Sequence, residues 1–242
     1  MWIAANLAVV PDAVLPTLIV AAVALLLALA ELAFPARTAI RARWPLNLAL
    51  GAFNLALGAA IGLAIPLAGS LWADTHNIGL LRWLAIAPPI AVPSAVLVLD
   101  LAIYWQHRLL HILPWLWPLH RTHHRDVAMD VTTGVRFHPG EIAVSALYKA
   151  AVVIALGASP LAVLIFQTLL GIASLWEHAN LRLPPRLDRL LRHVLVTPAM
   201  HLVHHGRDGD DMRTNYGFST SLWDRLFGSY RERGQSERLG AE

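Results

Sequence analysis

The sequence contains no cysteine among its 242 residues. Disulfides, thiolate-bound zinc, cysteine-ligated iron–sulfur clusters and cysteine nucleophiles are therefore all excluded. Charged residues are also scarce, at 14%, whereas hydrophobic residues make up 57% of the chain and the mean hydropathy is +0.54. This composition is too apolar for an ordinary soluble domain of this length, so we expect one membrane-embedded unit.

Lysine is nearly absent, because Lys149 is the only one, and arginine carries almost all of the positive charge. In a membrane protein such charge orients the chain, and without an aromatic-interleaved basic patch we expect no nucleic-acid partner. Of the 19 basic residues, 17 fall in residues 35–45, in residues 106–141 and after residue 180. The positive-inside rule then places these regions in the cytoplasm, and the arginine and alanine bias favours a multi-pass protein of the bacterial inner membrane.

Five apolar runs are expected to form membrane helices, and they lie at residues 14–34, 46–72, 84–105, 142–156 and 161–176. The first lacks a basic start and a small-residue cleavage site, so we interpret it as a retained helix. The third contains Pro88, Pro89 and Pro93, and we expect its helix to be kinked or to begin near Pro93. The last two are short for an untilted crossing and predict a membrane hairpin.

The expected fold is all-α, with polytopic membrane helices that carry a cytoplasmic helical cap. Residues 1–95 would form N-terminal membrane helices, residues 96–230 a second domain that includes the hairpin at about 142–176, and residues 231–242 a polar, disordered tail. Residues 184–198 combine an apolar face of helical spacing with a charged opposite face, which predicts a helix in the membrane interface. Its apolar positions are Leu187, Leu190, Leu191, Val194 and Leu195.

Histidine is in clear excess, with 12 residues, and all except His76 lie between His107 and His205. Residues three or four apart share one face of a helix, and this spacing recurs in three clusters. The clusters are His107 and His111; His120, His123 and His124; and His201, His204 and His205. Many imidazoles without a thiolate indicate a transition metal such as iron, copper, nickel or zinc. Because burying so many polar rings without a function is costly, we expect a metal site at the cytoplasmic membrane surface.

His138 and His178 lie where the chain returns to the same surface, and for each a ligand role and a structural role are equally supported by the residues alone. A zinc-dependent hydrolase of lipid esters or amides is an alternative function. It is disfavoured because the chain lacks a His-Glu-x-x-His motif and holds more histidines than zinc catalysis needs. A metal carrier would require more polar residues along the membrane segments.

The motifs from about residue 100 to residue 229 resemble those of the fatty acid hydroxylase and sterol desaturase superfamily of membrane di-iron enzymes. They lie at residues 104–111, 120–124, 136–141, 178–180, 197–205, 215–217 and 223–228. The resemblance implies that the cap holds a histidine-rich dimetal site with two iron ions. The implied ligands are His107, His111, His120, His123, His124, His201, His204 and His205, with His178 joining them and His138 as a weaker candidate.

The resemblance implies an oxygenase that uses O2 as co-substrate and two electrons to hydroxylate or desaturate a membrane lipid, such as a fatty acyl chain, sterol, carotenoid or ether lipid. Without cysteine or a dinucleotide-binding motif, the chain would receive its electrons from a separate reductase, ferredoxin or cytochrome. Metal-bound imidazoles require hydrogen-bond partners, and our hypothesis gives this role to Asp224, Asn180 and Asn215. The particular lipid and the oligomeric state are left open.

The predicted topology places residues 74–81 on the side of the membrane opposite to the histidines. The absence of cysteine allows a clean test, because Thr75→Cys would introduce a single thiol. We expect an impermeant thiol reagent to label this variant from the periplasmic side. Labelling from the cytoplasmic side alone would contradict the topology.

Overall fold

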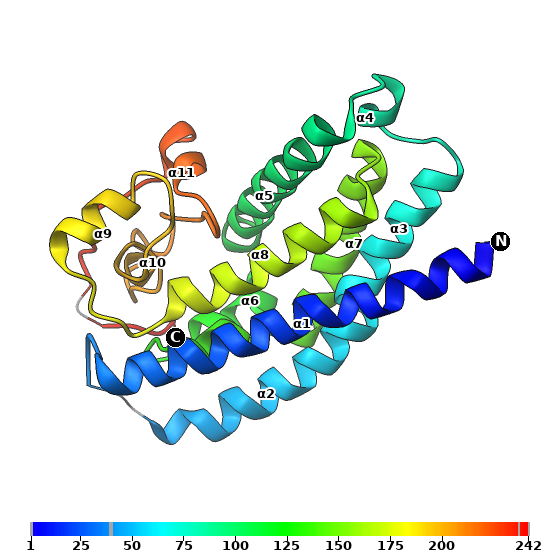
Figure 1. The fold of residues 1–242 in the computed structure, drawn as a ribbon. Helices are drawn as coiled ribbons and strands as arrows, with labels where there is room; N and C mark the ends of the chain where they lie inside the picture. Colours follow the sequence, from blue (N-terminus) through cyan, green and yellow to red (C-terminus); the bar gives the residue numbers. More distant parts are fainter. Residues whose placement is uncertain (1, 39–40, 237, 242) are drawn as a thin grey trace.

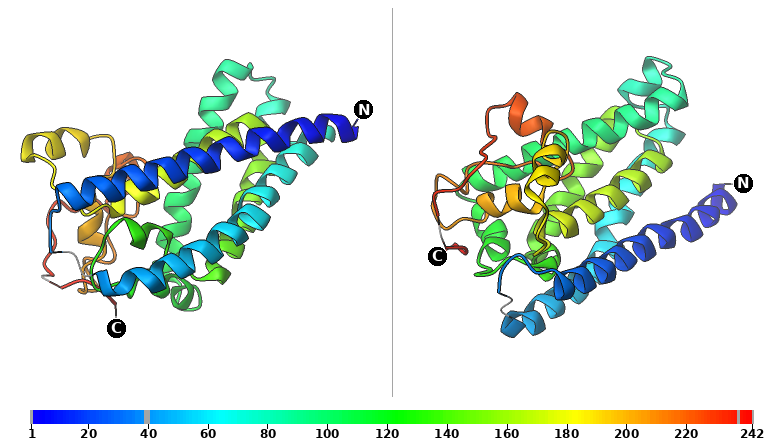
Figure 2. Two further views of the ribbon diagram at one scale, coloured as in Figure 1. Left: turned by 60° about the horizontal axis from the view of Figure 1, so that its bottom comes forward. Right: turned by 60° about the vertical axis from the view of Figure 1, so that its left-hand side comes forward.

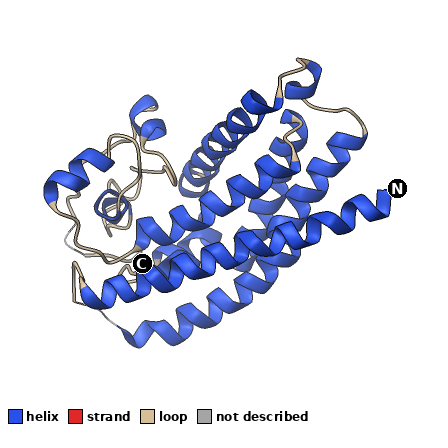
Figure 3. Cartoon of the chain, viewed as in Figure 1, coloured by secondary structure: helices blue, strands red, loops and turns tan. Residues whose placement is uncertain are grey.

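The computed structural model describes residues 2–38, 41–236 and 238–241, and within them the regular elements are helices joined by loops (Figure 1, Figure 3). Five helical segments are long and apolar enough to cross a membrane. They are Val14–Ala33, Arg41–Trp83, Pro88–Ile112, Pro139–Leu156 and Pro160–His178. The all-α fold and the five apolar runs expected from the sequence are therefore confirmed.

The first two spanning segments are long rods that lie against the hairpin helices. Helix α1 (Trp2–Ala33) packs against α8. The two helices approach closely at Gly171, because a Cβ atom added to this glycine would lie only 2.9 Å from the side chain of Val20. The second segment consists of α2 (Trp44–Leu57), a π-helical stretch (Gly58–Leu63) and α3 (Ala64–Thr75), and α3 packs against α7. Such π-helical turns inside α-helices are rare and often accompany functional sites.

Helix α5 (Pro88–Ile112) begins earlier than the expected start near Pro93. Pro88 and Pro89 occupy its first turn, where backbone N–H groups have no partner within the helix, so proline is well suited there. Pro93 lies inside the helix. The short helix α4 (Leu80–Trp83) precedes α5. At its other end α5 extends to Ile112 and carries His107 and His111 in its last turns.

Helices α7 (Pro139–Leu156) and α8 (Pro160–His178) form the expected hairpin. Gly157 ends α7 with φ of 66°, a left-handed conformation that glycine adopts without strain. The hairpin packs against α5 through a buried apolar cluster that includes Leu99, Ile103, Val163 and Phe166. This core positions the ends of α5 and α8 side by side, so that both can contribute to one site.

Short elements form a cap at the end of the bundle away from α4 and the N-terminus, as the two views of Figure 2 show. They are α6 (Trp117–His124), the 3-10 helix Val131–Val135, α9 (Pro185–Leu191), α10 (Pro198–His204) and α11 (Leu222–Leu226). The carboxylate of Glu31 on α1 accepts the backbone N–H groups of Val131 and Asn180. The cap is thereby attached directly to a membrane helix.

Helix α9 is shorter than the interfacial helix expected at residues 184–198 and ends at Leu191. Leu190 is 68% exposed and Val194 is 55% exposed, as a membrane-facing surface requires. On the opposite face, Arg186 and Arg189 are exposed, whereas Asp188 and Arg192 are buried as an ion pair. This buried pair fixes the helix to the cap and leaves the apolar side chains outside.

The segment from residue 231 was expected to be a disordered tail, but its described residues pack on the cap. The buried carboxylate of Asp211 accepts the backbone N–H groups of Gln235 and Ser236 and pairs with Arg231 at 2.7 Å. Further along, Ala241 donates its backbone N–H to the carbonyl of His124. A single buried acid thus orders a segment whose composition indicates disorder.

Replacing Asp211 with Asn should release this segment, because the amide cannot form the ion pair with Arg231. Burial alone would raise the pKa of Asp211, but the hydrogen bonds from Ser236 and Arg231 hold it below its usual value. An aspartate whose pKa is lower in the folded protein than in the unfolded chain, where it is about 3.9, stabilises the fold at pH values above about 3.9. This stabilisation is lost as the pH falls through the pKa of the folded state. We expect trypsin to cut the Asp211→Asn variant after Arg231 and Arg233 at least tenfold faster at pH 7.

The exposed neighbour Asp210 provides the control, because Asp210→Asn changes the same charge without touching residues 231–241. Mass spectrometry of the fragments gives the cleavage rates. Equal rates for the wild type and both variants would show that Asp211 does not order the segment.

Candidate metal centre

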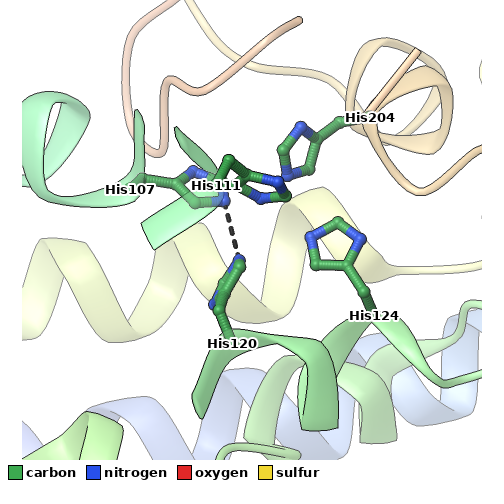
Figure 4. Close-up of side chains that lie close together, drawn as sticks. All are labelled: His107, His111, His120, His124 and His204. Carbon is green, nitrogen blue, oxygen red and sulfur yellow. Dashed lines mark hydrogen bonds between the residues drawn. The ribbon is translucent and has the colours of Figure 1, made fainter. Parts of the chain in front are cut away.

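Nine histidines from four helices converge in the cap and divide into two groups, and within each group the nearest ring nitrogens lie within 4.8 Å of one another. The first group takes two rings from α5, two from α6 and one from α10, and it consists of His107, His111, His120, His124 and His204 (Figure 4). The second consists of His123, His178, His201 and His205. The arrangement therefore offers two centres rather than one.

Each of the short helices α6 and α10 supplies both groups. On α6, His120 and His124 are four residues apart and project to the first group, while His123 projects to the second. On α10, His204 joins the first group, and the i, i+4 pair His201 and His205 joins the second. The three sequence clusters are therefore regrouped, because helical spacing sends neighbouring histidines to different faces.

The donor atoms fit a metal ion in both spacing and burial. Ring nitrogens approach one another closely in both groups, with His107 Nε2 to His120 Nε2 at 3.0 Å and His178 Nε2 to His123 Nε2 at 2.9 Å. Two imidazole ligands at right angles, each about 2.1 Å from one ion, would lie about 3 Å apart. Among the described residues, His111 Nε2 and His204 Nε2 have no protein partner although both are buried, which is costly unless another group binds them.

Hydrogen bonds on the outer side of the rings set which nitrogen points inward. His107 Nδ1 donates to the carbonyl of Tyr216 at 2.8 Å, and His204 Nδ1 donates to that of Thr214 at 2.7 Å. His120 Nδ1 lies 2.8 Å from the carboxylate of Glu141. A ring that donates from Nδ1 keeps the lone pair of Nε2 free for a metal.

Burial keeps these imidazoles in the form that binds metal. Desolvation, and then the neighbouring rings, hold the pKa values of five cap histidines well below the usual value of 6.5. They are His123, His124, His201, His204 and His205. Neutral imidazole is the ligand form, so these rings need not lose a proton when an ion binds at neutral pH.

The three residues expected to hold imidazoles in place act on loops instead. Asp224 accepts the N–H groups of Tyr216 and Gly217, so it holds the turn whose carbonyl binds His107. Asn215 bridges the backbone carbonyl of Met200 and the backbone of Arg231, and Asn180 binds the backbone of Arg37. Their hydrogen bonds support the loops around the rings, and the hypothesis of direct contact is corrected.

His138 also differs from its expected role as a weaker ligand candidate. Its Nδ1 accepts the backbone N–H of Gly140 at 3.0 Å, which makes it the cap of the first turn of α7, and it belongs to neither group. The residue that reaches the first group from this motif is Glu141, three positions later. The sequence offered one signal for this role, because Glu141 is an acidic residue in the first helical turn after His138.

Glu177 is a second carboxylate near the rings, and none of the sequence motifs predicts its role. It is fully buried, and its Oε1 lies 3.7 Å from both His201 Nε2 and His178 Nδ1. Neither of its carboxylate oxygens has a hydrogen-bond partner within the described residues. A carboxyl group beside the second group would supply a negative charge on ionisation, at the place where a cation would bind.

A cavity of about 650 Å³ opens from the first group into the membrane helices. His107, His120 and Glu141 line its inner end, together with Phe218. Its walls come mainly from apolar residues of α1, α2, α5, α7 and α8. The volume lies in the range of ligand-binding sites, and apolar walls of this kind suit a hydrocarbon.

Residues 92–229, more than half of the chain, match the fatty acid hydroxylase family. The chain belongs to this family. The match covers α5 to α11 and contains all nine grouped histidines. The family assignment expected from the motifs is thereby confirmed, and the membrane helices establish an integral membrane protein.

Individual relatives carry the names of lipid-modifying enzymes. Alkylglycerol monooxygenase of Homo sapiens is 31% identical over 57% of this chain and 30% of its own length. Ornithine lipid hydroxylase OlsE of Rhizobium tropici is 29% identical over 72% of this chain and 52% of its own length. A probable Delta(7)-sterol 5(6)-desaturase of Neurospora crassa is 31% identical over 67% of this chain and 44% of its own length. The chain thus spans no more than about half the length of these relatives, and no solved structure matches it.

Metal content should separate grouped histidines from the others. His178→Ala removes a nitrogen that lies 2.9–3.1 Å from His123, His201 and His205, so one of two bound ions should be lost or bound at least tenfold more weakly. His138→Ala, on the same surface but outside both groups, should retain two ions. Elemental analysis per chain gives the answer, and equal metal content in the two variants would contradict the grouping.

Proposed function

We propose that this chain is a membrane-bound di-iron oxygenase that hydroxylates or desaturates a lipid, with O2 as co-substrate and electrons from a separate donor. The observation that carries the proposal is the pair of all-nitrogen histidine groups in the cap, the first of which lies at the inner end of an apolar cavity within membrane helices. The family membership and the names of the relatives support the same class of reaction.

The histidines would hold two iron ions, one in each group. Five nitrogen donors in the first group and four in the second suit a borderline transition metal. Iron bound there would supply the activation of O2 and the removal of hydrogen from an unreactive C–H bond. The alternative of a zinc-dependent hydrolase is less well supported, because a catalytic zinc commonly takes three protein ligands and an open position.

The protein's own residues bind and orient the substrate. Apolar side chains such as Leu48, Val20 and Leu110 line the cavity and would enclose a hydrocarbon chain. Phe137 stacks on the ring of His123, with ring centroids 4.8 Å apart, and also lines the cavity. These contacts exclude water between the lipid and the histidines and hold one carbon of the lipid near His107 and His120.

Glu141 would keep the first group in its binding geometry. Its carboxylate accepts the Nδ1 proton of His120, so that Nε2 of this ring stays deprotonated toward His107. Glu141 also lines the cavity. The same side chain would therefore affect both the approach of the substrate and the orientation of the His120 ring.

The substrate would be a membrane lipid with a long apolar part, such as a fatty acyl chain, sterol, carotenoid or ether lipid. A separate reductase, ferredoxin or cytochrome would dock from the cytoplasm, where we place the histidine groups in a bacterial inner membrane. The arginine distribution supports this orientation, since most basic residues flank the cap rather than the loop at residues 74–81.

Product analysis tests the proposal. Iron-loaded protein in lipid bilayers, with a chemically reduced ferredoxin and ¹⁸O2, should convert a membrane lipid extract to products that carry one ¹⁸O or lack two hydrogens. His107→Ala, His123→Ala and His204→Ala should each lower product at least a hundredfold while insertion into the membrane is unchanged, because burial of apolar helices drives insertion. Product formed without O2, or by zinc-loaded protein, would overturn the oxygenase proposal in favour of hydrolysis.

A further inference from the structure

Among the described residues that line the cavity there is one lysine and no arginine, and the proposed chemistry gives this lysine no role. Lys149, the only lysine of the chain, lies on α7 in the cavity wall and is 7% exposed. We propose that Lys149, held in position by Gln167, binds a carboxylate of the lipid that occupies the cavity and so determines which carbon lies at the histidines. This inference rests on the proposed lipid oxygenase function.

The ammonium group of Lys149 is buried without an anionic partner. Within the part of the chain that the structure describes, it donates to Gln167 Oε1 at 2.9 Å and has no carboxylate beside it. The other arginine or lysine that is buried among the described residues, Arg192, is paired with Asp188. An uncompensated buried ammonium is costly, so an anion that enters the cavity would be bound strongly there.

Gln167 holds the ammonium group of Lys149 in position. Its Nε2 donates to the carbonyl of Gly62 at 2.7 Å, in the π-helical stretch, and its Oε1 accepts from Lys149. The side-chain amide of Gln167 is therefore fixed at both ends, and the remaining protons of the ammonium are free to reach the cavity. Lys149, Gln167 and Gly62 all line this cavity.

One face of α7 connects this anchor to the metal centre. Glu141, Ser145 and Lys149 follow an i, i+4, i+8 spacing, and all three line the cavity. Glu141 binds His120, so the first residue of this row marks the metal end and the last marks the anchor. Eight residues at a helical rise of 1.5 Å separate the two ends by about 12 Å.

This separation defines a length for the substrate. An extended hydrocarbon chain advances about 1.25 Å per carbon–carbon bond of about 1.5 Å, so roughly eight to ten bonds span the distance. A fatty acid anchored by its carboxylate would therefore present a carbon in the middle of its chain to the histidines. A lipid without an anion would bind in more than one register.

Binding is measured on the full-length protein in lipid bilayers, by displacement of a fluorescent fatty acid. Hexadecanoic acid should bind wild type at least tenfold more tightly than its methyl ester. Lys149→Met should abolish this preference, with the affinity for the ester unchanged, whereas Lys149→Arg should retain it. Leu147→Met, on the exposed side of the same helix turn, is the matched control and should behave as wild type.

Unchanged preference for the acid in Lys149→Met would overturn the inference. Loss of affinity for both the acid and the ester in Lys149→Met would also overturn it, because a purely structural role of Lys149 would give that result. Lys149→Arg shows whether the helix tolerates a substitution at this position. In turnover, the wild type should oxidise one mid-chain carbon and Lys149→Met several. Selective binding without any oxygenated product would instead contradict the proposed function and leave the anchor intact, so the two failures are distinguishable.

Discussion

Nine imidazole rings converge in the cap, eight of them buried, and the surrounding elements depend on how their nitrogens are paired. Within the part of the chain that the structure describes, six of these ring nitrogens are buried without a protein partner. Each would cost about 1–3 kcal/mol if left unpaired, so together they approach the whole stability of a typical domain, about 5–15 kcal/mol. A bound cation would remove this cost for the nitrogens that coordinate it, such as Nε2 of His111 and Nε2 of His204, and so favours the close packing of the rings.

The membrane helices hold these rings at one depth. Helices α5 and α8 end in the cap and deliver His107, His111 and His178, while α1 binds the cap through Glu31. The same helices enclose the apolar cavity, so the surface that would enclose a lipid and the surface that would bind metal are built from one core. A change in packing between α5 and α8 would therefore affect both surfaces.

The parts of the structure that follow local periodicity could be predicted from the sequence. Apolar length located the spanning helices, and three- and four-residue spacing located the histidine clusters. The parts that depend on contacts between distant segments could not. Helical spacing alone does not tell which ring of α6 meets α5 and which meets α8, and the regrouping of His123 with His178 depends on tertiary packing.

The same limit explains the other differences. Asp224 was expected to contact a ring, but it acts one step away through the turn at Tyr216, because loop carbonyls rather than side chains reach several of the rings. The polar composition after residue 230 indicates disorder, yet one buried acid, Asp211, orders the segment. In the sequence alone, the prolines near the start of α5 could mark either the beginning of a helix or a break within it. The structure places Pro88 in the first turn, which identifies it as the beginning of the helix.

The central claim is that two metal ions lie in two separate histidine groups. An anomalous difference map, collected at the iron absorption edge from crystals of iron-loaded protein, tests it most directly. Two peaks per chain are expected, one among His107, His111, His120, His124 and His204, and the other among His123, His178, His201 and His205. A single peak, or a peak bound by residues outside these groups, would contradict it.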